Sequence, residues 1–458
     1  MASMAPQAPL ARHAAVLARR AGTALAVAAL LGAAAAPAAF ADSPAAPAPA
    51  PSPKKLPDAL YGTKDPQYDG VWRQSLALLA QHTVGVRPAT PAVSWLAGQQ
   101  CADGAFTAFR ADPGTACGAK TLRDTNQTAA AVQALAALGG HSDVVKKAVS
   151  WLKSVQNDDG GWSSMPGSDS DANSTSLAIA ALAAGGEKPE SVQSKKGKSP
   201  FQGLLTFQLG CAAAKDGDQQ AAAKPDERGA FTFQLKGAAP NTDATAAAAT
   251  GALGDGFVVE PAGKDAKKPV RPLNCKDGKD GTEGGDSGKR TADDAERAAD
   301  AASAYLVDRL DENGQHLRSA MPGAEKQPDV GNTADAVVAL AAGSHGAAAQ
   351  QPLKWLQKNS ADWAKDGGPA AYAQLVFAAH ATGTDPRNFG GTDLVAALNA
   401  TGPEPAGSSA PSAAPGKDAK DSEDSDGTIN VWWVIGIGLA IGAGAGFLLS
   451  GRRKKSRL

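Results

Sequence analysis

Polar side chains gather at the start of each Ala-rich segment of this 458-residue chain, where their types and spacing could do chemistry. They are carboxylates and amides: Asp69, Asp124, Asn126, Gln127, Asp171, Asn173, Asp243, Asp329 and Asn332. A helix start needs only one side-chain oxygen as a cap, and capping is the alternative role for each of them. Several starts carry two or three such groups, and the surplus suits a ligand with amide or hydroxyl groups. We therefore predict a ligand-binding rim that also includes Trp72 and Tyr372.

Histidine and cysteine could supply metal ligands or nucleophiles, but their spacing favours neither role. The histidines after the N-terminal segment are His82, His141, His316, His345 and His380. None has a ligand spacing to a cysteine, so we predict no metal site and no cofactor. His141 and His345 follow helix-ending glycines, so we expect them to cap a helix or face solvent. His380 is expected in the core.

The four cysteines are predicted to form two disulfide bonds. Cys101 and Cys117 bracket one loop, whereas Cys211 and Cys275 bracket a long insertion rich in Gly, Lys and Asp. Four cysteines allow three pairings, and we favour these two because each closes a loop of high entropic cost. Disulfide bonds in turn fit an exported protein. A cysteine nucleophile is the alternative, but the sequence places no histidine beside one.

Alternating helices are predicted to position these residues. A polar cap, an Ala-rich apolar run and a terminal Gly together make a complete helix signal. Six such helices are predicted to start near residues 69, 124, 171, 241, 329 and 366. Six amphipathic partners are predicted to start near residues 89, 143, 199, 293, 349 and 390. Twelve alternating helices suit a closed ring with six helices inside, and such a ring brings the polar starts together at one mouth.

A motif recurs along the same stretch. Its clearest copy is Gln156-Asn157-Asp158-Asp159-Gly160-Gly161-Trp162, and a second copy runs from Gln100 to Phe106. This Gln-x3-Gly-x-Trp pattern resembles the repeat of the squalene cyclase and protein prenyltransferase superfamily. The resemblance implies an all-α (α/α)6 toroid over residues 58–402. It also implies a choice of functions, because the superfamily includes enzymes and non-enzymatic carriers such as the cobalamin carriers.

The features that this resemblance would imply for an enzyme are incomplete here. Protonating cyclases use an Asp-x-Asp-Asp acid, and the nearest match, Asp169-Ser170-Asp171-Ala172, lacks the last Asp. Aromatic faces that could stabilise a cation are almost limited, on the inner helices, to Trp72, Tyr372 and Phe377. The Asp, Cys and His zinc set of the protein prenyltransferases is also missing. We therefore predict no catalytic residues, an interior without an acid cluster, and a protein that is not an enzyme.

Both ends of the chain look like targeting segments. Residues 1–41 contain Arg19-Arg20, an apolar run and Ala39-Phe40-Ala41, which predicts a secretory signal peptide. An Ala/Pro-rich linker is predicted at 42–57 and a disordered stalk at 403–428. Residues 429–450 are predicted to span the membrane, with the basic tail 451–458 in the cytoplasm. A buried helix or a cell-wall sorting signal is the alternative for the apolar run, although no Leu-Pro-x-Thr-Gly precedes it.

Charge argues against nucleic acid as a partner. The chain has 45 basic and 46 acidic residues, but eight of the basic residues lie in the two targeting segments. The body is therefore acidic and has little attraction for phosphate backbones.

We accordingly expect an extracytoplasmic body on a bacterial cell membrane, exported by the secretory route and held by a single C-terminal span. Its predicted function is to bind a small molecule, cobalamin-like or isoprenoid, for uptake with a transporter or another surface protein as partner. An enzyme of the prenyltransferase or terpene cyclase class is one alternative. A protein-interaction scaffold at the cell surface is the other.

Overall fold

A computed structural model describes residues 56–211, 223–236, 239–262, 266–273, 275, 292–320 and 323–407. The predicted signal peptide, membrane span and basic tail lie outside these residues, as do most of the predicted linker and stalk. Within the described ranges, no helix is both long enough and apolar enough to cross a membrane.

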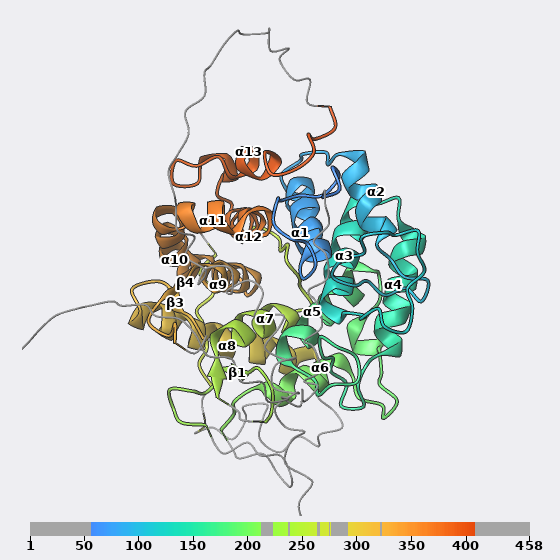
Figure 1. Cartoon of the computed structure of the whole chain (residues 1–458). Helices are drawn as coiled ribbons and strands as arrows, with labels where there is room; N and C mark the ends of the chain where they lie inside the picture. Colours follow the sequence, from blue (N-terminus) through green and yellow to red (C-terminus); the bar gives the residue numbers. More distant parts are fainter. Residues whose placement is uncertain are drawn as a thin grey trace, which may run out of the picture. The chain divides into compact units, whose positions relative to one another are not determined.

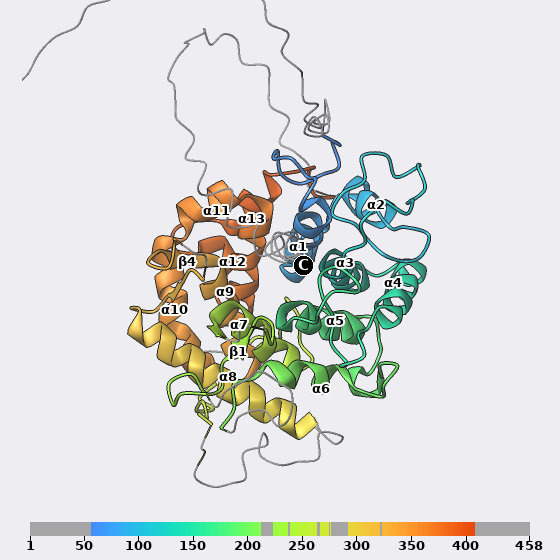
Figure 2. The same ribbon diagram turned by 60° about the horizontal axis from the view of Figure 1, so that its bottom comes forward.

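Six Ala-rich helices form a closed inner ring. They are α1 (Gly70–Thr83), α3 (Thr125–Leu138), α5 (Ala172–Ala184), α7 (Thr242–Ala252), α9 (Val330–Ala342) and α12 (Pro369–Ala381). Each packs against the next, and α12 returns to α1, which closes the ring (Figure 2). Small side chains such as Ala129, Ala178 and Ala248 are fully buried and allow neighbours on both sides to approach closely.

Six further helices cover the outside of this ring. They are α2 (Thr90–Gly98), α4 (Ser142–Ser154), α6 (Pro200–Leu204), α8 (Ala292–Glu312), α10 (Gly346–Asn359) and α13 (Leu394–Asn399). In Figure 1 the sequence colours run once around the ring, with inner and outer helices alternating. Helix α4 is amphipathic and buries Val145, Ala148, Val149 and Leu152 on one side. The predicted six-inside, six-outside helical arrangement is therefore present in the described residues.

The last inner helix starts later than predicted. Asp366 does not open it, but lies exposed in an additional short helix, α11 (Ala361–Gly367). Helix α12 begins at Pro369 after Gly368, whose φ of 72° turns the chain. Proline suits this first helical position because its fixed φ is already helical and its missing N–H would have no partner there.

Short β pairs lead directly into inner helices. Strand β1 (Phe231–Thr232) pairs with β2 (Pro240–Asn241), and β3 (Leu317–Arg318) pairs with β4 (Pro328–Asp329). In each case the second strand ends where α7 or α9 begins. Three 3-10 turns, η1 (Pro189–Ser191), η2 (Leu205–Phe207) and η3 (Pro386–Asn388), complete the connections.

The repeated motif joins an outer helix to the following inner helix. The Trp162 ring is fully buried, and its Nε1 donates to the carbonyl oxygen of Leu152 in α4 at 2.8 Å. Its backbone N–H donates to Thr175 Oγ1 in α5 at 3.0 Å. Phe106, Phe231 and Leu317 donate in the same way to a threonine of their own inner helix. That threonine always follows the capping residue by four positions.

Part of the predicted insertion forms what we call the strap, residues 253–262 and 266–273, which lies against inner helices. The Phe257 backbone N–H donates to Gln133 Oε1 of α3 at 3.1 Å, and the Ala262 N–H donates to the Ala381 carbonyl of α12 at 2.9 Å. The Phe257 ring meets Trp72 edge-on at 5.4 Å and stacks on Phe377 at 6.1 Å between centroids. The strap therefore places the Phe257 ring against aromatic side chains of α1 and α12.

His345 anchors the far end of this strap, which corrects its predicted role as a cap or a solvent-facing residue. It is only 1% exposed. Its Nδ1 lies 2.8 Å from the Lys268 carbonyl oxygen, and its Nε2 lies 3.2 Å from Asp300 Oδ1. Lys268 Nζ also pairs with Asp300 at 2.9 Å. The sequence could not show this because Lys268 and Asp300 are remote from His345 in the chain.

The ordered body also extends a little beyond its predicted end. Residues 403–407, assigned above to the stalk, still contact the body. Tyr61 donates through its hydroxyl to the Pro403 carbonyl at 3.2 Å, and the Ala406 N–H donates to the Arg87 carbonyl at 2.9 Å.

Candidate functional site

Helix capping accounts for several residues of the predicted rim. Asp124 Oδ1 accepts from the backbone N–H of Asn126 at 2.8 Å and of Gln127 at 3.0 Å. Asp171 caps α5 and Asp329 caps α9 in the same manner. Burial has the largest effect on the pKa of Asp124 and of Asp171, and it raises each pKa to about 6. The capping hydrogen bonds oppose this rise. These three carboxyls therefore have a structural role in starting their helices.

Asp69 differs from the other helix starts. Its side chain makes no cap and instead pairs with Arg73 of α1 at 3.3 Å. Trp72, on the same helix, is partly buried and occupied by its edge contact with Phe257. The structure thus gives both predicted rim residues a packing partner from the protein itself.

Asn332 and Tyr372 also belong to the predicted rim. Asn332 donates through Nδ2 to its own capping residue, Asp329, at 2.8 Å. Tyr372 lies partly buried in the first turn of α12, and burial raises the pKa of its hydroxyl.

Asp243 makes the first side-chain bridge between inner helices at the rim. It is the second residue of α7, and Asn241 rather than Asp243 caps that helix. Asn173 Nδ2, from the second residue of α5, donates to Asp243 Oδ2 at 2.8 Å. Burial raises the pKa of Asp243 to about 6, and the charge of Asp329 adds to the rise.

Asp335 and Gln374 form a second bridge, which the sequence analysis missed. Gln374 Nε2 of α12 donates to both oxygens of Asp335 of α9, at 3.2 and 3.3 Å. Burial raises the pKa of Asp335 to about 7, and repulsion from Asp243 and Asp329 contributes. Each is the sixth residue of its inner helix, one turn beyond the second position. In α9 and α12 that second position is Gly331 or Ala370, so no polar residue one turn earlier pointed to them.

Asp243, Asp329 and Asp335 together form what we call the acidic arc, on the neighbouring helices α7 and α9. Its presence corrects the expectation of an interior without an acid cluster. No Lys, Arg or His of the described ranges forms an ion pair with any of the three. The arc is therefore acidic without an internal counter-charge in that part of the chain.

Three amide oxygens near the same helix starts have no hydrogen-bond partner among the described residues. They are Asn126 Oδ1, Gln127 Oε1 and Asn173 Oδ1. Asn126 is 7% exposed and Gln127 is fully buried. Asn126, Asn173 and Asp243 occupy the same second position on the consecutive inner helices α3, α5 and α7. Thr125 Oγ1 and Arg73 Nε at the same end of the ring also lack a partner among the described residues. The unpaired groups there are therefore mostly, but not only, acceptors.

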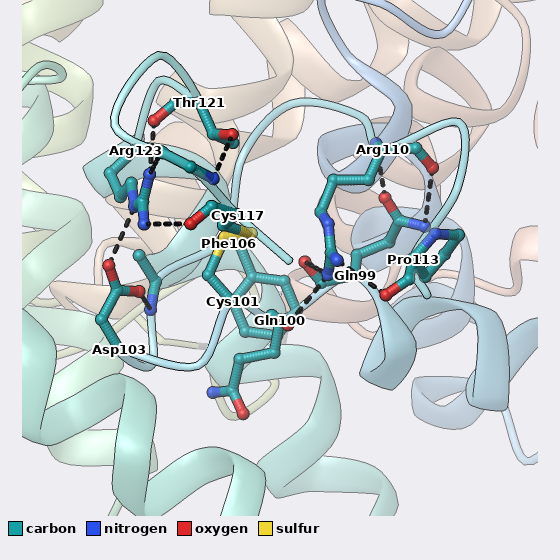
Figure 3. Close-up of a disulfide and its surroundings, with 12 residues drawn as sticks. Gln99, Gln100, Cys101, Asp103, Phe106, Arg110, Pro113, Cys117, Thr121 and Arg123 are labelled. Carbon is teal, nitrogen blue, oxygen red and sulfur yellow. Dashed lines mark hydrogen bonds and ion pairs between the residues drawn. A yellow bond between two sulfur atoms is a disulfide. The ribbon is translucent and has the colours of Figure 1, made fainter. Parts of the chain in front are cut away.

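Both predicted disulfide bonds are present. Cys101–Cys117 spans 16 residues and Cys211–Cys275 spans 64 residues. Figure 3 shows the first of them between two buttressing arginines. Arg110 donates to the carbonyl oxygens of Gln100 and Pro113 at 3.0 and 2.7 Å, and Arg123 pairs with Asp103 at 2.9 Å. These bonds fix the loop that precedes α3 rather than form a reactive site.

No grouping of three or more His, Cys, Asp or Glu residues suited to a metal ion occurs in the described part of the chain. The acidic arc itself does not meet that geometry. The arrangement can instead accept hydrogen bonds and positive charge through oxygen atoms of carboxyl and amide groups.

Comparison with known proteins supports the toroid. Residues 73–207 match the family model described as prenyltransferase alpha-alpha toroid domain. The resemblance to the squalene cyclase and prenyltransferase toroid superfamily is thereby confirmed over that stretch, from α1 to η2. No curated protein matches this chain. A solved structure described as that of a protein from Actinoplanes shares 14% identity with a TM-score of 0.27. It covers 68% of this chain and 100% of its own, but its likeness is too low to carry an argument.

Proposed function

We propose that the N-terminal end of the inner ring binds a small polar molecule and does not convert it. The observation that carries this proposal is the set of unpartnered amide oxygens on Asn126, Gln127 and Asn173. A buried acceptor without a donor costs about 1–3 kcal/mol. A ligand that donates hydrogen bonds to these oxygens would offset that cost, which gives a reason for placing them together at one end of a ring.

The charge of the same region separates the two ligand classes that the family resemblance suggested. Polyprenyl phosphates are anionic, and the acidic arc would repel them. Corrinoids carry several amide groups, whose N–H donors match the unpaired oxygens. We therefore favour an amide-bearing ligand over an isoprenoid phosphate.

The proposed location is the outer side of a bacterial cell membrane, where the protein would capture its ligand for uptake. Two disulfide bonds within the body support an oxidising compartment. The predicted signal peptide and C-terminal span support anchoring, with a transporter or another surface protein as the partner.

Calorimetric titration of the full mature chain with corrinoids and polyprenyl phosphates tests this function. We expect corrinoid binding that weakens by about tenfold or more in Gln127→Ala, because a ligand hydrogen bond is lost. Asp169→Ala is the matched control, since Asp169 is exposed and lies outside the rim. Binding that is unchanged in Gln127→Ala would refute the site.

Acid catalysis is a second candidate, and one observation favours it. Asp335 has a pKa of about 7, so it would be partly protonated at neutral pH and could donate a proton. Turnover of a terpenoid substrate by the mature chain, abolished in Asp335→Asn, would establish this alternative and refute binding without conversion.

The scaffold alternative has weaker support. Among the described residues, Tyr68 at 73% and Leu122 at 65% are the large hydrophobic side chains that stand exposed. Two such side chains are too few for the contiguous apolar patch that a protein partner requires.

A further inference from the structure

We propose that the ligand carries a cationic ammonium group, bound by the acidic arc between Asp243 and Asp335. This inference rests on the proposed binding function and names the chemical class of the ligand. It starts from a contrast within the fold. Asp124 and Asp171 are buried or partly buried carboxyls that cap a helix, whereas Asp69 and Asp300 have a cation beside them.

Asp69 and Asp300 are carboxyls whose charge is neutralised by a neighbouring cationic side chain. Asp69 pairs with Arg73, and Asp300 pairs with Lys268 and adjoins His345. Asp243 and Asp335 have neither arrangement within the described ranges. Each receives only an amide N–H from a neighbouring inner helix. A counter-charge for these two carboxyls must therefore come from outside those ranges.

The unpartnered amides provide an independent observation. Gln127 and Asn126 are more than nine-tenths buried, and each presents an oxygen without a donor. Asn173 adds an unpartnered oxygen at the arc itself, because its Nδ2 donates to Asp243 while its Oδ1 has no partner. In each of these three amides the unpaired atom is thus an acceptor. The complementary ligand must supply donors.

An ammonium group meets both requirements. It offers three N–H donors and one positive charge, whereas a hydroxyl or an amide would leave the arc unneutralised. An anionic ligand would add repulsion. The indole ring of Trp363 also lies near Gln374. A Cβ placed at Gly331 would be 3.3 Å from Trp363 Cζ2 and 3.6 Å from Gln374 Oε1. Indole faces attract ammonium groups.

The test uses three probes with the same six-carbon chain: 1,6-diaminohexane, 1,6-hexanediol and adipate. Binding to the full mature chain is measured by calorimetry and by ligand-observed NMR at pH 8, where the arc is ionised. We expect the diamine to bind at least about tenfold more tightly than the diol, because its hydrogen bonds are charge-assisted, and adipate not to bind. Asp335→Asn and Asp243→Asn should each remove most of that preference.

Asp255→Asn is the matched control, because Asp255 is also partly buried but lies in the strap after α7. It should leave diamine binding unchanged. Equal binding of diol and diamine, with loss of both in Gln127→Ala, would overturn the cationic ligand while the binding function stands. Binding of none of the three probes would also overturn it, and the corrinoid titration would then decide the binding function separately. A loss in Asp255→Asn equal to that in Asp335→Asn would reveal general charge attraction and refute the arc.

Discussion

Asn173 donates a 2.8 Å hydrogen bond through Nδ2 to Asp243 Oδ2, and so joins the second residues of two neighbouring inner helices. The bond spans 70 residues of sequence, and it leaves Asn173 Oδ1 buried without a partner. One side chain thereby contributes both to the closure of the ring and to the unpaired acceptors at its rim. The predictions below separate these structural and ligand-binding contributions.

The capping role of Asp171 predicts a loss of stability on truncation. Asp171→Ala removes the side-chain acceptor for the Ser174 N–H, so the free energy of unfolding should fall by about 1–2 kcal/mol. Urea denaturation measures it. Asp169→Ala should change almost nothing because Asp169 is exposed. If the two variants lost equal stability, the incomplete acid motif would not be explained by capping.

The acidic arc predicts that the ligand-free body becomes less stable as the pH rises. The folded-state pKa of Asp335 is about 7, above its unfolded value of about 4, so the folded state holds more protons between these values. As regards this group, stability should therefore be full below about pH 4, should fall as the pH rises from about 4 to 7, and should level off above pH 7. Asp335→Asn should remove part of this slope, on the order of 2 kcal/mol between pH 5 and 8. Thermal unfolding at both pH values checks it, and an equal slope in wild type and variant would contradict the assignment.

The strap anchor predicts a local loosening when its histidine is replaced. His345→Ala removes the contacts to the Lys268 carbonyl and to Asp300, so residues 266–273 should exchange amide hydrogens faster. Hydrogen exchange followed by mass spectrometry measures this. His82→Ala is the control, because His82 is exposed. Unchanged exchange in residues 266–273 would show that the strap is held without His345.

Loop length predicts unequal effects of the two disulfide bonds. Loss of Cys211–Cys275, which closes 64 residues, should cost about 4 kcal/mol, and loss of Cys101–Cys117, which closes 16 residues, about 3 kcal/mol. Denaturation of the paired Cys→Ser variants compares them. The reverse order would indicate that strain or residual unfolded structure, rather than chain entropy, dominates.

The fold was predictable because its signals are local. Helices α3, α5 and α9 each show a capping Asp, an Ala-rich run and a terminal glycine, and the Trp162 motif marks the connection between layers. The start of α12 was misplaced because Asp366 resembles a cap, whereas Gly368 and Pro369 set the true boundary.

The site was less predictable because its important relationships are between helices. Asp124, Asp171 and Asp329 were correctly placed at helix starts, but capping explains them. Asp335 and Gln374 carry no cap or turn signal, and their proximity depends on the packing of α9 against α12. The burial of His345 likewise depends on Lys268 and Asp300, which no short-range pattern connects to it.

The most direct test of the central claim is native mass spectrometry of the full mature chain purified from its own cell, with an Asn126→Ala/Gln127→Ala variant alongside. The account predicts a non-covalent small-molecule adduct on the wild-type chain, unaltered in mass over time and absent or strongly reduced on the variant. A wild-type chain without an adduct, or an adduct retained equally by the variant, would contradict it.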